Sequence, residues 1–235
     1  MIFTTKLLSC ILMLPLIGSA ALLITPFHNK KVLKSIVLNT SCLTFVVSLS
    51  TWVLFDKSIG TFQFTEKFFW IPFFNFNFPL GIDGISLFFV ILTTMLVPLC
   101  LLASWDSIQT DLKKYFMCFL IMEFFLIGVF CILDLLLFYI FFESVLIPMY
   151  LIVGVWGSRE RKIRAAYFFF LYTLLGSVLM LLSILYIYYQ VGTTDYETLI
   201  TFIFSPVEQK IIWLSFFMSF ATKVPMVPVH LWLPE

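Results

Sequence analysis

The sequence predicts an all-α membrane protein with about seven transmembrane helices. Three observations predict this class: 62% of the 235 residues are apolar, only 11% are charged, and the apolar residues gather in long runs. Ordinary soluble domains are about 45–50% apolar and about 25% charged, and a membrane helix needs about 20 mostly apolar residues. A net charge of +1 provides no basic surface for phosphates. The composition therefore excludes a soluble globule, a disordered tail and a nucleic-acid-binding protein.

Each apolar run ends at a polar or helix-breaking stretch. A basic segment separates the first run from the second, and Pro225 and Pro228 interrupt the seventh. Two prolines three residues apart break a helix, because proline lacks a backbone N–H and clashes with the preceding turn. The predicted helices cover residues 7–26, 35–55, 84–104, 115–133, 135–156 and 165–190, and the seventh begins near Ile211.

The connection between the second and third helices, residues 56–83, is rich in Phe and Trp. Aromatic rings favour the membrane–water boundary. We therefore expect this segment either to lie at that boundary or to form a short hairpin packed on the helices. The chain divides into two predicted parts. Residues 1–114 hold the first three helices and the aromatic-rich connection, and residues 115–235 hold helices four to seven.

Basic residues are distributed unequally between the two predicted faces. The loops after helices one, three and five carry Lys30, Lys31, Lys34, Lys113, Lys114, Arg159, Arg161, Lys162 and Arg164. The other face carries only Lys6, Lys57, Lys67 and Lys210. Lysine and arginine favour the negative side of a membrane, so the N-terminus is predicted on the positive side. The arginine-rich loop is also a candidate for binding lipid headgroups.

Glu143 is the first candidate functional residue, because a charge at the bilayer centre costs at least about 2.5–3.5 kcal/mol. It follows Leu135 by eight residues, which places it about 12 Å into the membrane. Pro148 frees a backbone carbonyl one turn earlier, near Glu143. The alternative is a glutamate that is protonated and hydrogen-bonded locally, with no functional role.

Lys223 is the second candidate, and it directly precedes the helix break at Pro225 and Pro228. It lies twelve residues past Ile211, about 18 Å deep, so its depth differs from that of Glu143 by about 6 Å. Broken backbone at membrane depth is tolerated where it is buried in protein or lines a watery cavity, and it often marks an ion site. The alternative is a lysine that extends to the interface.

The chemistry of such a pair is proton transfer. Burial disfavours the charged form of a lysine, whereas a nearby carboxylate favours it. Moving or neutralising Glu143 would therefore make Lys223 release its proton.

Three further ionisable residues receive weaker predictions. Glu123 lies eight residues into the fourth helix, where it either extends a proton path or is an isolated protonated acid. His230 follows the helix break and titrates near neutral pH, so it is predicted to be a relay or a structural hydrogen-bonding group. Asp134, between helices four and five, is expected to be solvated. The sequence has no phosphate- or dinucleotide-binding motif and no paired histidines. We expect no metal and no cofactor in this chain.

Four segments resemble a known family. They are Leu80-Gly81-Ile82-Asp83-Gly84-Ile85-Ser86, the stretch from Phe142-Glu143-Ser144 to Pro148-Met149-Tyr150, Gly154-Val155-Trp156-Gly157, and the stretch from Lys223-Val224-Pro225 to Trp232-Leu233-Pro234. The amino-acid sequences of these segments are similar to those of NADH dehydrogenase subunit 4, an antiporter-like membrane subunit of respiratory complex I. The similarity is to its plant and protist mitochondrial versions. The resemblance is strong from about Gly81 to the end and looser before it.

The resemblance implies a fold of about fourteen helices with two inverted repeats of five, of which this chain would be the N-terminal half. It implies that Glu143 and Lys223 are the family's helix-five glutamate and broken-helix-seven lysine, and it supplies no clear role for Glu123. NADH, FMN, Fe–S clusters and ubiquinone would then belong to other subunits, and other membrane-arm subunits and lipids would be partners. The implied location is the mitochondrial inner membrane, with the N-terminus on the intermembrane-space side.

The length departs from the family pattern, because subunit 4 is about twice as long as this chain. We expect a separate polypeptide to carry the C-terminal half, although a truncated form is the alternative. The leading hypothesis for function is part of a proton-pumping NADH:ubiquinone oxidoreductase, without independent catalysis. A cation/proton antiporter subunit and a non-conducting scaffold of the membrane arm are the alternatives.

Overall fold

Helices dominate the computed structural model, which describes residues 6–26, 29–71, 76–230 and 232–233. The chain separates into two units of packed elements, Met1–Leu133 and Asp134–Glu235. Among the described residues, six spans are long and apolar enough to cross a membrane. These are α1 (Leu7–Ile24), α2 (Lys30–Leu54), α3 (Gly84–Ala103), α4 (Leu112–Cys131), the span Leu135–Trp156, and α7 (Lys162–Val191).

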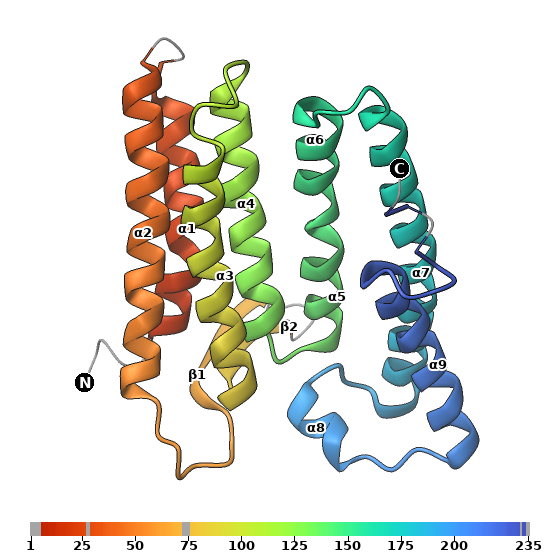
Figure 1. Ribbon diagram of the computed structural model, residues 1–235. Coiled ribbons are helices and arrows are strands. Elements are labelled where there is room, and N and C mark those ends of the chain that lie inside the picture. Colours follow the sequence, from red (N-terminus) through yellow and green to blue (C-terminus); the bar gives the residue numbers. More distant parts are fainter. Residues whose placement is uncertain (1–5, 27–28, 72–75, 231, 234–235) are drawn as a thin grey trace. The chain divides into compact units, whose positions relative to one another are not determined.

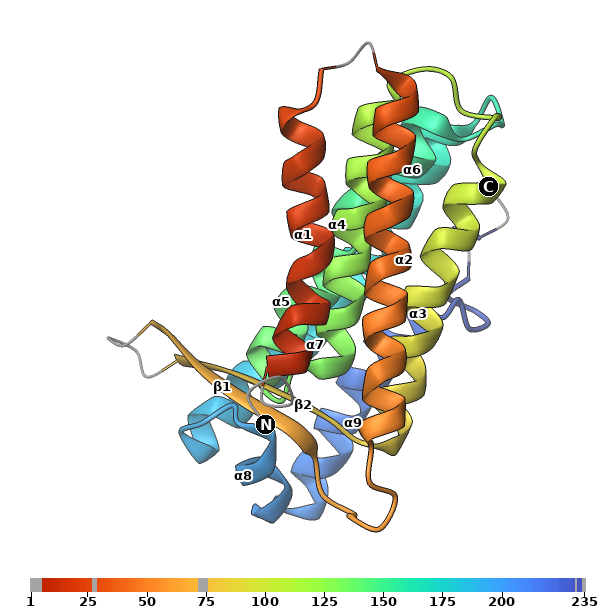
Figure 2. The same cartoon turned by 90° about the vertical axis from the view of Figure 1, so that its left-hand side faces the viewer.

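In the first unit, α1 to α4 pack side by side as a bundle (Figures 1 and 2). Helix α2 turns four hydroxyl side chains inward and exposes large apolar ones such as Val46 and Val53. This reverses the pattern of a soluble protein, and it suits a helix that faces lipid on its outer side and polar partners inside.

The aromatic-rich connection contains a hairpin of β1 (Gln63–Ile71) and β2 (Phe76–Ile82). The strands pair antiparallel, with Glu66 opposite Leu80, and Figure 2 shows them beside the beginning of α1. The hairpin alternative is therefore confirmed for the strands, and residues 72–75 between them lie outside the described residues.

Glu66 of the hairpin caps the first turn of α1. Its carboxylate accepts hydrogen bonds from the backbone N–H of Leu8 at 3.0 Å and of Ser9 at 3.3 Å. The first N–H groups of a helix have no partner within the helix, and a negative charge there is favourable. The carboxylate is buried, so this cap also fastens the hairpin to the bundle.

Replacing Glu66 with alanine is expected to lower the free energy of unfolding by about 1–3 kcal/mol, because two buried N–H groups lose their acceptor. Thermal unfolding of the detergent-solubilised chain would measure this loss. Glu66→Gln retains one acceptor oxygen and should lose less. Equal stability of the alanine variant and the parent would contradict the capping role.

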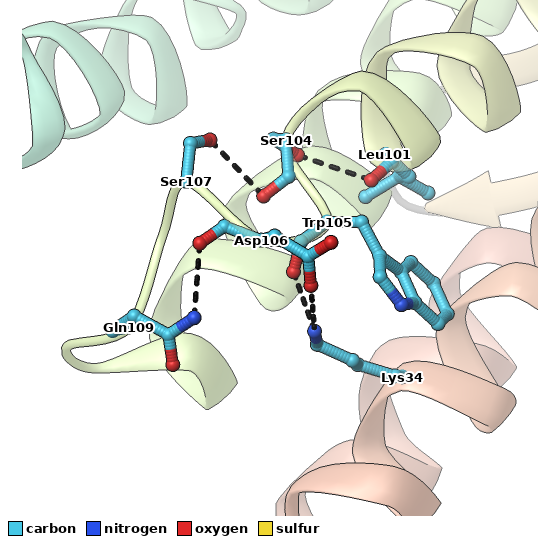
Figure 3. Close-up of polar contacts among 7 residues, drawn as sticks. All are labelled: Lys34, Leu101, Ser104, Trp105, Asp106, Ser107 and Gln109. Carbon is cyan, nitrogen blue, oxygen red and sulfur yellow. Dashed lines mark hydrogen bonds and ion pairs between the residues drawn. The ribbon is translucent and has the colours of Figure 1, made fainter.

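Two lysines fasten the opposite end of the bundle. The Lys34 ammonium donates to the Trp105 carbonyl, lies 4.8 Å from the Trp105 ring centroid and is 3.7 Å from the Asp106 carboxylate (Figure 3). The Lys113 ammonium donates to the carbonyls of Leu23 and Thr25 at 2.8 and 2.9 Å. Cations stabilise the unpaired carbonyls at a helix C-terminus, so Lys113 caps the end of α1.

The second unit contains α5 (Leu135–Ser144), α6 (Leu146–Trp156), α7, the short α8 (Tyr196–Thr201) and α9 (Pro206–Lys223). The predicted fifth helix is interrupted at Val145, three residues before Pro148, into α5 and α6. Helix α9 begins with a capping box between Ser205 and Glu208, earlier than the predicted start near Ile211. Helix α9 carries Glu208, Lys210 and Lys223 within its 18 residues, and it is not among the six spans.

Asp134 is a correction to the sequence analysis, because it is buried rather than solvated. Its carboxylate accepts from the Leu137 N–H at 2.9 Å, which caps α5, and from the Thr194 hydroxyl at 2.5 Å. The Leu135 N–H in turn donates to the Thr194 carbonyl at 2.9 Å. The first N–H groups of a helix have no acceptor within the helix, and they need one when another segment covers the helix N-terminus. The burial of Asp134 follows from this requirement.

Candidate functional site

Glu143 lies in the last turn of α5, next to the interruption at Val145. Both of its carboxyl oxygens are buried, and neither forms a well-aligned hydrogen bond among the described residues, although the Ser177 hydroxyl of α7 lies nearby. A buried carboxyl group with so little hydrogen bonding is costly when it is charged. Such a group is poised to bind a proton, a cation or water.

Lys223 is the last residue of α9, and its ammonium reaches the same turn of α5. The ammonium donates to the Phe142 carbonyl and lies 3.3 Å from the Phe142 ring centroid. Glu143 and Lys223 interact electrostatically, but the ammonium forms its hydrogen bond with the neighbouring residue rather than with the carboxyl group. The structure thus brings the two sequence-predicted charges to adjacent positions without joining them directly.

The close packing of α7 and α9 places Lys223 in that position (Figure 1). Gly176 of α7 faces Thr222, the residue before Lys223. A Cβ atom on Gly176 would lie 2.9 Å from the Thr222 Cβ and still closer to its hydroxyl. Only a glycine therefore allows α9 to approach α7 this closely.

The helix break after Lys223 is held by substitute hydrogen bonds. Pro225 has no N–H to offer to the Ala221 carbonyl, and the N–H of Met226 donates to that carbonyl instead, at 2.9 Å. The indole N–H of Trp232 donates to the Thr222 carbonyl at 2.8 Å. These bonds satisfy carbonyls that the end of a helix leaves unpaired. Pro228 lies in the turns that follow.

His230 lies beyond the break, and its Nδ1 is buried without a hydrogen-bond partner among the described residues. Glu123 belongs to the other unit, where its carboxyl Oε1 lies 2.8 Å from the Thr44 hydroxyl. Within the described part of the chain, no three His, Cys, Asp or Glu side chains gather in a way that could hold a metal ion.

Three structural features near the candidate residues were not predicted from the sequence. Gly176 and Thr222 form the α7–α9 contact, and no single sequence reveals which helices touch. The Phe142 carbonyl is a backbone group, which leaves no signal in the side chains. The buried hydroxyl groups of α2 could have been found, because Ser41, Thr44, Ser48 and Thr51 recur at the spacing of one helix face.

Two family models match the chain. The model for NADH-ubiquinone oxidoreductase chain 4, amino terminus, matches residues 7–133. The model for NADH:quinone oxidoreductase/Mrp antiporter, TM, matches residues 132–235. The two matches meet where the two structural units meet.

Curated relatives and solved structures agree with these models. The NADH-ubiquinone oxidoreductase chain 4 of Chondrus crispus is 61% identical over 94% of this chain and 45% of the relative. That of Arabidopsis thaliana is 58% identical over 97% of this chain and 46% of the relative. The chain thus spans about half the length of the curated relatives that it matches.

A chain of respiratory complex I from Thermus thermophilus with bound NADH has a TM-score of 0.82 and 28% identity, covering 98% of this chain and 46% of that one. A chain of the membrane-bound sulfane sulfur reductase, an archaeal respiratory membrane complex, has a TM-score of 0.78 over 95% of this chain and 35% of that one. At 20% identity, this second likeness shows the fold alone. The chain belongs to the NADH-ubiquinone oxidoreductase chain 4 family, the antiporter-like membrane subunits of complex I.

Proposed function

We propose that this chain belongs to the membrane arm of a proton-pumping NADH:ubiquinone oxidoreductase and supplies Glu143 and Lys223 as coupled protonatable groups. The observation that carries the proposal is the position of the Lys223 ammonium. It is hydrogen-bonded to the Phe142 carbonyl, one residue from a buried carboxyl group whose oxygens form no well-aligned hydrogen bond among the described residues.

The arrangement suits a switch with two states. When the ammonium moves from the Phe142 carbonyl to the Glu143 carboxylate, an ion pair forms, and it favours charge on both groups. When the ammonium returns, both groups lose this stabilisation, although the carboxyl oxygens of Glu143 remain buried. Lys223 then tends to release a proton, and Glu143 tends to bind one. The interruption at Val145 and the break after Lys223 are where the backbone can adjust between the two states.

His230 is our candidate for the next proton carrier. It follows the broken end of α9, and its Nδ1 is buried without a partner among the described residues. Imidazole exchanges protons near neutral pH, and one nitrogen can take a proton while the other gives one. Its partner in such an exchange would be a water molecule or a group from another part of the assembled complex.

We assign NADH oxidation and quinone reduction, with FMN and the Fe–S clusters, to other subunits of the complex. We place the chain in the mitochondrial inner membrane, with its N-terminus on the intermembrane-space side, as the distribution of basic residues predicts. A cavity of about 360 Å³ in the second unit is lined by apolar side chains together with Arg159 and Lys162. Its apolar walls and cationic groups suit an anionic lipid.

Glu143→Gln in the assembled complex tests the proposal. Glutamine keeps the size and polarity of glutamate but exchanges no proton, so coupled NADH:quinone turnover and proton pumping should fall at least about tenfold. Pumping would be measured with a pH-sensitive dye in vesicles, and assembly would be verified by native electrophoresis.

Glu208→Gln is the matched control. Glu208 is partly exposed in the first turn of α9. Glutamine preserves its capping box and can still accept from the Tyr186 hydroxyl, so both activities should remain within about twofold of the parent. An assembled Glu143→Gln complex that pumps as many protons per NADH as the parent would refute the proton-transfer role and favour a scaffold.

A further inference from the structure

One face of α2 carries a continuous row of buried hydroxyl groups inside the first unit. Ser41, Thr44, Ser48 and Thr51 each have an exposed fraction of 0%, and together they extend about 15 Å along the helix. We refer to these four residues as the hydroxyl face. The Ser48 hydroxyl lies 2.7 Å from the Thr94 hydroxyl of α3. The hydroxyl face therefore lines the seam between α2 and its neighbours.

Glu123 projects into this seam from α4. Its exposed fraction is 0%, and its Oε1 lies 2.8 Å from the Thr44 Oγ1. Its Oε2 is buried and has no hydrogen-bond partner among the described residues. A fully buried carboxyl oxygen without a partner indicates that the group is either uncharged or completed by a ligand.

The single hydroxyl hydrogen of Thr44 bears on the charge state of Glu123. Thr44 Oγ1 lies 2.8 Å from the Ser41 carbonyl oxygen as well as 2.8 Å from Glu123 Oε1. A threonine hydroxyl has one hydrogen to donate, and a carbonyl oxygen can only accept. If Glu123 is charged, Thr44 must share its one hydrogen between Ser41 and Glu123. If Glu123 is neutral and donates from Oε1, Thr44 can donate fully to Ser41, and each contact has its own hydrogen atom.

The surrounding charges agree with an uncharged acid. Helices α1, α2 and α3 and strand β2 pack against α4, and no described titratable group of these elements interacts electrostatically with Glu123. The Lys34 ammonium donates a hydrogen bond to the Trp105 carbonyl and forms an ion pair with Asp106. Lys113 caps α1, and it lies about 15 Å from Glu123 along α4. Among the residues that the structure describes, no cation therefore compensates an ionised carboxylate in this seam.

We propose that Glu123 is a proton-binding site of the first unit, a neutral carboxylic acid that donates its hydrogen to Thr44 and faces the hydroxyl face of α2. The site uses none of the residues of the Glu143–Lys223 pair. Proton exchange would run through Thr44, whose hydroxyl can accept from Glu123 and donate to the Ser41 carbonyl or to a water molecule. The free Oε2 is the acceptor for such a water molecule.

Infrared spectroscopy of the purified complex that contains this chain tests the site. The parent should show a carbonyl stretch of a protonated carboxylic acid that persists above neutral pH and is absent from Glu123→Gln. Thr44→Val keeps the shape of threonine but removes the acceptor, so the same band should move to higher frequency. The control Ser48→Ala removes another hydroxyl of the same face, one that hydrogen-bonds with Thr94 rather than with Glu123, and should leave the band in place.

Two results would overturn the inference. One is an identical set of carboxylic-acid bands in the parent and in Glu123→Gln from acid to alkaline pH. The other is an unmoved band in Thr44→Val, which decides the question even if Glu123→Gln fails to assemble. The measurement reports the protonation of one carboxyl group and not pumping, so its failure would leave the proposal for Glu143 and Lys223 untouched.

Discussion

Lys223→Met is expected to reduce coupled proton pumping by about a hundredfold or more, because it removes the group that we propose to exchange the proton. Methionine has a flexible apolar side chain of similar length, so it preserves packing against the Phe142 ring while it eliminates both the charge and the hydrogen bond to the Phe142 carbonyl. The measurement is proton uptake by vesicles containing the assembled complex, divided by the rate of NADH oxidation.

Lys223→Arg separates charge from proton exchange. A guanidinium keeps the positive charge and the contact with the aromatic ring, but it does not deprotonate in a protein. A group that only neutralises Glu143 could be replaced by arginine, whereas a group that releases its proton could not. Substantial pumping by the arginine variant would therefore contradict the proton-transfer role. Lys210→Met, at the exposed beginning of the same helix, should pump like the parent.

Gly176→Ala is expected to be the most damaging substitution among those that remove no charge. The new Cβ would lie 2.9 Å from the Thr222 Cβ and closer to its hydroxyl, so α9 must move away from α7. Overpacking of this kind costs about 1–3 kcal/mol. The displacement would also carry Lys223 away from Phe142, because Lys223 directly follows Thr222. We expect lower thermal stability together with a loss of pumping of at least about tenfold.

A reciprocal exchange distinguishes this contact from a general loss of stability. In the double variant Gly176→Ala with Thr222→Gly, the small residue moves to the other helix and the close approach is restored, at a cost of about 1 kcal/mol for a glycine within α9. Pumping should recover in the double variant. Gly154→Ala is the matched control, since its Cβ would meet the Ala166 Cβ at an ordinary 3.5 Å. If the double variant were as inactive as Gly176→Ala, the α7–α9 contact would not position Lys223.

The membrane spans could be predicted because their length is set by bilayer thickness and not by partners. The boundaries of α1, α3 and α4 lie within three residues of the predicted ones. The early start of α9 depends on Ser205, Pro206 and Glu208, a local capping signal that apolar runs do not reveal. The hairpin remained one of two alternatives, since aromatic residues suit both a strand and an interface.

The candidate site was only partly predictable for a related reason. Glu143 and Lys223 are conspicuous because a charge in an apolar run is costly. Serine and threonine carry no such cost, so the hydroxyl face of α2 does not stand out by hydropathy. Its residues become informative only when they are read at helical spacing and placed opposite Glu123. The detail that Lys223 bonds to a backbone carbonyl beside Glu143, rather than to its carboxyl group, depends on tertiary packing alone.

Lys34 and Lys113 have a consequence for biogenesis. While the helices are inserted, an ammonium group in the first turns of a membrane helix keeps that end of the helix from crossing the bilayer. Once the bundle has formed, the same two ammonium groups are enclosed by carbonyl oxygens and an indole ring. Each ammonium group therefore has two roles. During synthesis it sets the membrane topology, and in the folded bundle it hydrogen-bonds to carbonyl groups at the end of a neighbouring helix. A neutral substitution at either position would disturb insertion and folding together, and a topology assay on the nascent chain would separate the two effects.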